Sequence, residues 1–245
     1  MSSEADLLTT DEELEEYEPE RPAWSRWVII GGTLLAVLLL GATLGMFVTR
    51  AVDPVAEPPA VDSVEVGFAQ DMSVHHLQAV TMAGEARDRT SDKEIKQLAF
   101  DIERTQLEQV GRMKGMLMLW DRPEQATGAY MKWMTEPMPA MPGMPGMSGM
   151  SVPTVSPGGG VMPGMATEAE LKQLRSLSGK DLDVLFLQLM VRHHQGGASM
   201  AWYAQAHSSM PAIKALTNSI LVSQQAEVNQ MLDMLSARGA HPLPS

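Results

Sequence analysis

Cysteine is absent from this 245-residue chain, and aromatic side chains make up only 5% of it. Without cysteine there is no disulfide, no thiolate zinc site, no iron–sulfur cluster and no cysteine nucleophile. Basic residues are also few, since 18 Lys and Arg stand against 30 Asp and Glu. Nine of the acids lie in residues 1–20, so the formal charge of −12 falls to −3 for the rest of the chain. No basic stripe remains to hold a phosphate backbone, which argues against nucleic-acid binding.

Motifs for catalysis are lacking as well. The chain has no Glu-x-x-His, no His-Glu-x-x-His, no Gly-x-Ser-x-Gly and no Gly-rich phosphate loop. Methionine, by contrast, is in excess at 21 residues. Any metal site must therefore use His, Met, carboxylate or amide ligands. A binding protein without turnover is favoured over the alternative of an oxidoreductase that uses a bound metal.

Residues 27–48 form a run of 22 residues without a charge. At 1.5 Å per residue a helix of this length spans about 33 Å, enough for a bilayer core of about 30 Å. Two arginines precede the run and one follows it, and two tryptophans stand where an interfacial belt would lie (Arg21, Arg26, Arg50, Trp24, Trp27). The long acidic tail before the run and the lack of an Ala-x-Ala site argue against a cleaved signal peptide. We expect a single-pass signal-anchor in the cell membrane, with a cytoplasmic N-terminus and an extracytoplasmic main domain.

Composition divides the chain into six segments. Acidic and Pro- or Gly-rich stretches without apolar periodicity indicate disordered or linking segments, and the stretches with a 3.6-residue apolar period indicate helices. The expected segments are a disordered acidic tail (1–26), a transmembrane helix (27–48), a Pro-rich spacer (49–63), a first helical hairpin (64–134), a Met/Pro/Gly-rich linker (135–166) and a second hairpin (167–239), with 64–239 as one domain.

The two hairpins are an internal duplication. Without a gap, a shift of 118 residues aligns 68–121 with 186–239 and matches 18 of 54 positions, including His75-His76 with His193-His194. Each copy is expected to hold two helices, 64–88 and 92–119 or 180–207 and 210–237, with a short helix at 167–176 before the second copy. The breaks carry helix-start signals at Ser91 with Glu94, at Thr167 with Glu170, and at Pro211. Because neither hairpin can bury its apolar face alone, the sequence predicts an all-α four-helix bundle plus one transmembrane helix.

A duplicated Met-x2-His-His-x5-Met pattern is the strongest candidate for a metal site. Its residues are Met72, His75, His76 and Met82, with Met190, His193, His194 and Met200 in the second copy. On a helix the first Met lies one turn before either histidine, and thioether with imidazole suits copper(I) or another soft metal ion. The hairpin geometry also brings Gln106 towards His75, and Gln224 and Glu227 towards His193, while Asp71 could assist His75. Alternatively, the methionines only fill the core and the histidines only hydrogen-bond, although burying two imidazole pairs is then costly.

The linker offers a second candidate site. Its methionines recur every three residues, the period of polyproline II, at Met138, Met141, Met144, Met147 and Met150, and the step repeats at Met162 and Met165. Thioethers along one edge of the chain could capture a soft metal ion. The alternative is a flexible tether in which methionine has no role. Other methionines, including Met131 and Met134, are expected to pack or to lie at helix ends.

The segments FAQDMSVHHLQAVTMA and FLQLMVRHHQGGASMA, each followed by a helix with Gln and Met, resemble the two halves of the domain of unknown function 305 family. The resemblance covers about 65–238. It implies a ferritin-like four-helix bundle, secreted or membrane-anchored in bacteria, and a link of some members to copper binding and copper tolerance. Two positions differ between the halves, because Gln109 corresponds to Glu227 and Asp71 to Leu189.

The hypothesis from the sequence is a membrane-anchored, extracytoplasmic protein that sequesters or transfers copper(I) through its Met/His sites. The alternative is a non-catalytic structural or interaction module, without metal, that docks on a membrane or extracytoplasmic protein partner.

Overall fold

The computed structural model describes residues 22–52, 57–136 and 162–243. These residues form six helices and no strand, so the expected all-α fold is confirmed. The helices are α1 (Ala23–Val52), α2 (Val64–Arg89), α3 (Lys93–Leu119), α4 (Glu168–Ser176), α5 (Gly179–His207) and α6 (Pro211–Ala237). The chain divides into two compact units, residues 1–57 and 58–245.

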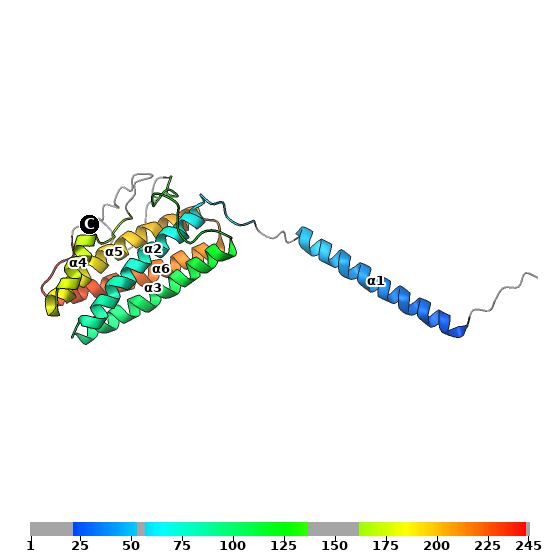
Figure 1. Cartoon of the computed structure of the whole chain (residues 1–245), viewed down its shortest axis with the longest axis horizontal. Coiled ribbons are helices and arrows are strands. Elements are labelled where there is room, and N and C mark those ends of the chain that lie inside the picture. Colours follow the sequence, from blue (N-terminus) through cyan, green and yellow to red (C-terminus); the bar gives the residue numbers. More distant parts are fainter. Residues whose placement is uncertain (1–21, 53–56, 137–161, 244–245) are drawn as a thin grey trace, which may run out of the picture. The chain divides into compact units, whose positions relative to one another are not determined.

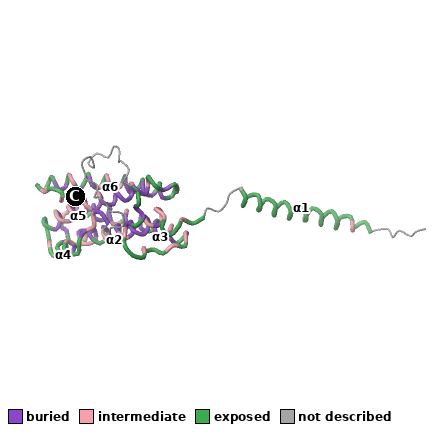
Figure 2. Tube along the Cα trace, turned by 90° about the horizontal axis from the view of Figure 1, so that it is seen from above, coloured by how far each residue is buried: buried purple, intermediate pink, exposed green. Residues whose placement is uncertain are grey.

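The first unit contains α1, which is long and apolar enough to cross a membrane, with a mean hydropathy of 2.3. Its residues are exposed along nearly the whole helix, as the colouring of Figure 2 shows. The hydroxyls of Thr33, Thr43 and Thr49 each donate to a carbonyl one turn earlier at 2.8–2.9 Å. A hydroxyl satisfied within its own helix needs no water, which suits a helix surrounded by lipid.

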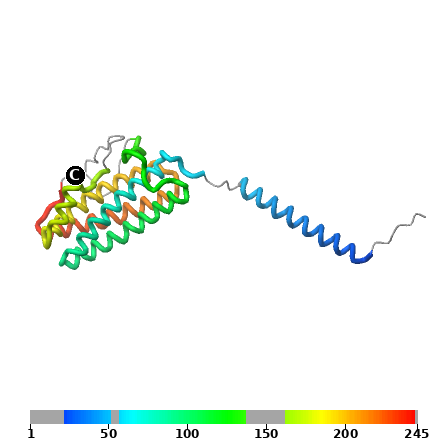
Figure 3. The backbone as a smooth tube through the Cα atoms, viewed as in Figure 1, coloured from blue at the N-terminus to red at the C-terminus, as the bar shows by residue number. Residues whose placement is uncertain are grey.

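The second unit is the expected four-helix bundle. Figure 1 shows α2, α3, α5 and α6 lying side by side, and the tube view in Figure 3 follows the same path. The α2–α3 and α5–α6 hairpins meet mainly through α2 against α5. The short α4 begins with the expected capping box of Thr167 and Glu170. At the start of α3 the cap is Asp92 rather than Ser91, because its carboxylate accepts from the amides of Glu94 and Ile95.

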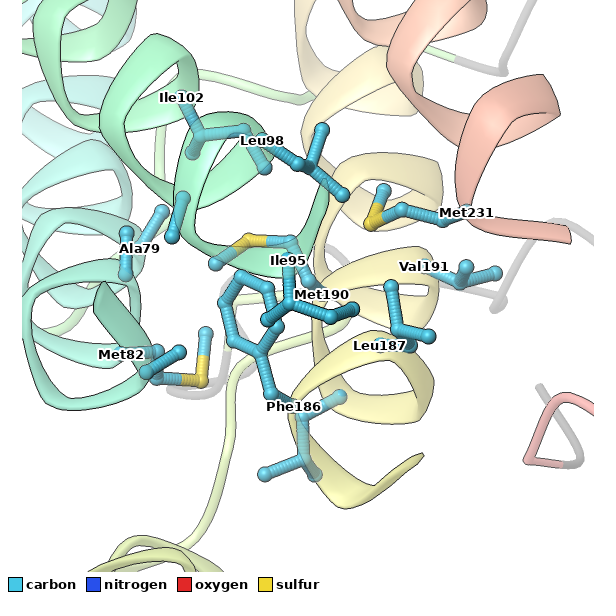
Figure 4. Close-up of a cluster of buried hydrophobic side chains, with 14 of the residues drawn as sticks. Ala79, Met82, Ile95, Leu98, Ile102, Phe186, Leu187, Met190, Val191 and Met231 are labelled. Atoms are coloured by element: carbon cyan, nitrogen blue, oxygen red, sulfur yellow. The ribbon is translucent and has the colours of Figure 1, made fainter. Parts of the chain in front are cut away.

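The core of the bundle consists of two apolar clusters that lie at different levels along the helices. One contains Met82 of α2 with Phe186 and Met190 of α5 (Figure 4), and the other contains Met72 of α2 with Met200 of α5. Each of the two central helices passes from one cluster to the other. The histidines of α2 and α5 lie in the sequence between these two parts of their helices, so they form a polar layer between two apolar ones.

Candidate metal centre

Four histidines form the layer between the apolar clusters, and each is fully buried. We call His75, His76, His193 and His194 the histidine layer. The rings of His75 and His193, from different hairpins, have centroids 3.8 Å apart at an interplanar angle of 35°. Within each helix the adjacent rings are 6.2 and 6.3 Å apart. The duplication therefore produces a central ring pair with one further histidine on either side.

The two outer histidines are bonded in the same way within their own hairpins. His76 Nε2 lies 2.7 Å from Gln109 Oε1, and His194 Nε2 lies 2.6 Å from Glu227 Oε2. Both contacts join positions that correspond under the shift of 118 residues. Carbonyl and carboxylate oxygens accept hydrogen bonds, so each Nε2 carries the proton. The sequence placed Glu227 near His193; the structure bonds it to His194 instead.

The central pair differs from the outer histidines in its partners. His75 Nε2 donates to the carbonyl oxygen of Pro163 at 3.1 Å. Neither ring nitrogen of His193 has a hydrogen-bond partner among the described residues. The Nδ1 atoms of His75, His76 and His194 are likewise buried without a partner. Because a neutral imidazole with its proton on Nε2 has a bare lone pair on Nδ1, three of the four histidines offer an unused electron-pair donor.

Burial keeps three of these imidazoles, those of His75, His76 and His193, uncharged. Desolvation lowers the pKa of His75 to about 4 and that of His76 to about 3, and the neighbouring ring of His75 contributes to the second shift. The pKa of His193 is held well below its ordinary value, first by desolvation and then by His75. At neutral pH these rings are therefore in the form that binds metal ions.

Two buried glutamines add further unused polar atoms. The amide nitrogen and oxygen of Gln106 and of Gln224 have no hydrogen-bond partner among the described residues. A Cβ at Gly197 would lie 3.0 Å from Gln224 Oε1 and 3.0 Å from His75 Cε1. Gly197 therefore leaves room for the Gln224 amide beside His75, a contact between hairpins that the sequence did not predict. Buried polar atoms without partners are costly in a core, which points to a ligand at this level.

The methionines of the motif border the histidine layer on both sides. All four are fully buried, with Met72 and Met200 in one apolar cluster and Met82 and Met190 in the other. The linker methionines Met138, Met141, Met144, Met147 and Met150 lie outside the described residues. Within the described ranges, no group of three or more His, Cys, Asp or Glu side chains could hold a metal ion.

Residues 162–166 run over the layer, and we call them the strap. In addition to the bond from His75 to Pro163, the side-chain amide of Gln78 makes two bonds to the backbone of Ala166, at 2.7 and 2.9 Å. A Cβ at Gly196 would lie 2.1 Å from Pro163 O, so only glycine admits the strap here. The segment that Gly196 admits against α5 is non-helical. Met162 of the strap is buried.

Asp71 is hydrogen-bonded to the segment that follows α3 and not to His75. Its Oδ2 accepts from the amide of Met131 at 2.6 Å and from Trp133 Nε1 at 2.9 Å. Burial raises the pKa of this carboxyl, and the two hydrogen bonds partly oppose the shift. Met131 and Trp133 are both buried against the bundle. The expectation that Asp71 assists His75 is therefore wrong, because its bonded oxygen is used by residues 60 and 62 positions further along.

Comparison with known proteins gives one family. The family model described as "Domain of unknown function (DUF305)" matches residues 65–235. A DUF305 protein from Streptomyces coelicolor that is described as secreted has 41% sequence identity and a TM-score of 0.63, with 75% of this chain and 99% of that chain covered. A DUF305 fragment from Deinococcus radiodurans has 29% identity and a TM-score of 0.54, covering 71% and 96%. CopM in its Cu(II)-bound form has 25% identity and a TM-score of 0.50, covering 72% and 97%. The comparison with curated proteins gave no match.

Proposed function

The chain belongs to the DUF305 family, and we propose that its bundle binds copper(I) at the histidine layer, for sequestration or transfer without chemical turnover. The observation that carries the proposal is the set of buried Nδ1 atoms without hydrogen-bond partners on all four histidines. A purely structural layer would be expected to satisfy these atoms, because each unpaired polar group in a core costs free energy. A metal ion would use them.

The donor set fits a soft monovalent ion better than a hard one. Neutral imidazoles and thioethers are the ligands that copper(I) prefers, whereas calcium and magnesium require several oxygen ligands. We assign His75, His76, His193 and His194 as nitrogen ligands, with no more than two of them to one ion, because no three such side chains of the described residues are placed to hold a metal ion together. Met72, Met82, Met190 and Met200 are proposed as sulfur ligands because they border the layer on both sides. CopM, whose structure is similar, is a protein solved with Cu(II) bound, which supports copper as the metal.

Two further parts of the chain complete the proposal. The apolar helix α1 would anchor the protein to the cell membrane, with the bundle on the extracytoplasmic side. Met138, Met141, Met144, Met147 and Met150 would capture the ion and pass it to the bundle. Replacing these five methionines with leucine should lower the number of copper(I) ions bound per chain and leave the tightest site unchanged. An unchanged stoichiometry would remove the linker from the proposal.

The test is an anaerobic titration of the full chain, in detergent micelles, with copper(I) against a chromogenic chelator. The double variant His75→Asn/His193→Asn removes both rings of the central pair. Loss of a residue that only hydrogen-bonds to a metal ligand costs about 10–100-fold in metal affinity. Loss of two ligands should therefore weaken copper(I) binding by more than about 100-fold. His241→Asn is the matched control, because this histidine is exposed and outside the layer.

Unfolding of the metal-free variants separates binding from folding. A folded double variant with wild-type copper(I) affinity would overturn the proposal. If the wild-type chain takes up no copper(I), and the histidine variants lose the same stability with and without the metal, the layer is structural and the interaction module is the better description.

A further inference from the structure

The two outer histidines have the same geometry but partners of different charge. Gln109 and Glu227 occupy corresponding positions of the two hairpins and bond His76 and His194 at nearly equal distances. Gln109 is a neutral amide whose nitrogen faces Ser223 Oγ at 3.5 Å. Glu227 is a carboxylate with only 13% of its side chain exposed. The duplicated layer therefore has an acid on one side only.

Among the described residues, the ion pairs and hydrogen bonds give Glu227 no cation and His76 no carboxylate. Among the described residues, no Lys or Arg forms an ion pair with Glu227, whose recorded partner is His194. The buried carboxylate of the first hairpin, Asp71, uses its bonded oxygen to hold Met131 and Trp133. Neither histidine of the first hairpin is hydrogen-bonded to a carboxylate in the described part of the chain.

A carboxylate on the far nitrogen of a histidine changes what the near nitrogen can do. When an acid accepts the Nε2 proton of a metal-bound histidine, it fixes the tautomer and makes Nδ1 a stronger donor. It also supplies a negative charge close to a cation that would otherwise be buried without compensation. An amide oxygen fixes the tautomer equally well but supplies no formal charge.

From this asymmetry we propose that Glu227 is a positioning residue that makes the second hairpin the tighter copper(I) site, so that His194 is occupied before His76. The inference rests on the proposed function, because it ranks the ligands of that same layer. It assigns metal preference to a single residue outside the Met-x2-His-His-x5-Met pattern.

The reciprocal exchange Glu227→Gln and Gln109→Glu tests the ranking with the chain as its own control. Copper(I) is added stepwise, without oxygen, to the full chain in micelles with ¹⁵N-labelled histidine, and the ring nitrogens are followed by NMR. We expect the His194 signals to shift first in the wild type. Glu227→Gln should weaken the tightest site by about 10–100-fold. The double exchange should make His76 the first to shift.

Three outcomes would overturn the inference. One is an unchanged affinity and order of filling in Glu227→Gln; a second is a double exchange that still fills His194 first. A wild-type chain that takes up no copper(I) would overturn the proposed function together with this ranking, whereas the first two leave copper binding itself in place. Gln109→Glu is the control for a merely structural effect, because tighter copper(I) binding in the first hairpin cannot result from damage to the second.

Discussion

The first hairpin and the second hairpin share a sequence pattern and a helical framework, but they differ where the connecting chain crosses them. Asp71 and Gln78 of the first hairpin bond the loop near Trp133 and the strap. The corresponding residues of the second hairpin are Leu189 and Gly196. Leu189 is apolar and buried, and Gly196 provides only space. A duplicated bundle has a single linker, so one copy supplies the polar contacts and the other supplies the room.

The largest loss of stability is expected when the residues at the corresponding positions Asp71 and Leu189 are exchanged. Leu189→Asp buries a carboxylate in an apolar cluster without a partner, which should cost about 3–5 kcal/mol of stability. Asp71→Leu leaves the N–H groups of Met131 and Trp133 without their acceptor and should cost about 1–3 kcal/mol. Denaturant unfolding of the metal-free variants measures both. Equal costs would show that the hairpins are interchangeable at this position.

The histidine layer should make stability depend on pH. His75 and His76 have folded-state pKa values of about 4 and about 3, below the unfolded value of 6.5. The stability that depends on these two rings being uncharged is therefore fully present above pH 6.5 and is lost as the pH falls towards the folded-state pKa values. For His75 alone the loss between pH 6.5 and 4 is on the order of 3 kcal/mol.

A variant of the first hairpin shows how much of this pH dependence of stability comes from His75 and His76. His75→Asn/His76→Asn should flatten the decline measured by denaturant unfolding between pH 7 and 4, and part of it should persist through His193, whose pKa is also lowered. A decline as steep as that of the wild type would mean that the first hairpin's histidines become charged in the folded bundle at no cost.

The smallest expected difference lies at the helix starts. Asp92 caps α3 with its side chain and forms an ion pair with Arg238, whereas α6 has no side-chain cap and begins with Pro211. Asp92→Ala should cost about 1 kcal/mol, typical of a lost cap. Pro211→Ala should cost about 0.5 kcal/mol, through the greater freedom of the unfolded chain. Thermal unfolding of the two variants compares them, and a larger effect at Pro211 would contradict this ranking.

The helices could be predicted closely from the sequence because their signals are local. In the bundle the apolar period and the breaks set the helix ends to within a residue, as with Val64–Arg89 against the expected 64–88, whereas α1 (Ala23–Val52) extends four residues beyond the expected 27–48 at each end. Ser91 and Asp92 are both good cap residues one position apart, and local sequence alone does not choose between them. In the structure Asp92 also binds Arg238, which is 146 residues away.

The site was predictable only where the duplication marked it. The two histidine pairs stand out because they repeat, whereas their partners depend on how the helices pair. His76 is bonded by Gln109, which was not among the partners expected from the sequence, because this contact depends on the register of α2 against α3. The position of the strap over the histidine layer could not be predicted, because its Pro- and Gly-rich sequence carries no helix or strand signal. Its contacts with His75 and Gln78 join residues 88 positions apart, and no local signal encodes them.

The anchoring of the linker at both ends has a consequence for local concentration. The amide of Met131 is bonded to Asp71 and the backbone of Ala166 to Gln78, so the 25 residues from 137 to 161 are joined to the bundle on both sides. An ion bound by the linker methionines would meet the bundle at an effective concentration on the order of millimolar, set by chain length and independent of how dilute the protein is.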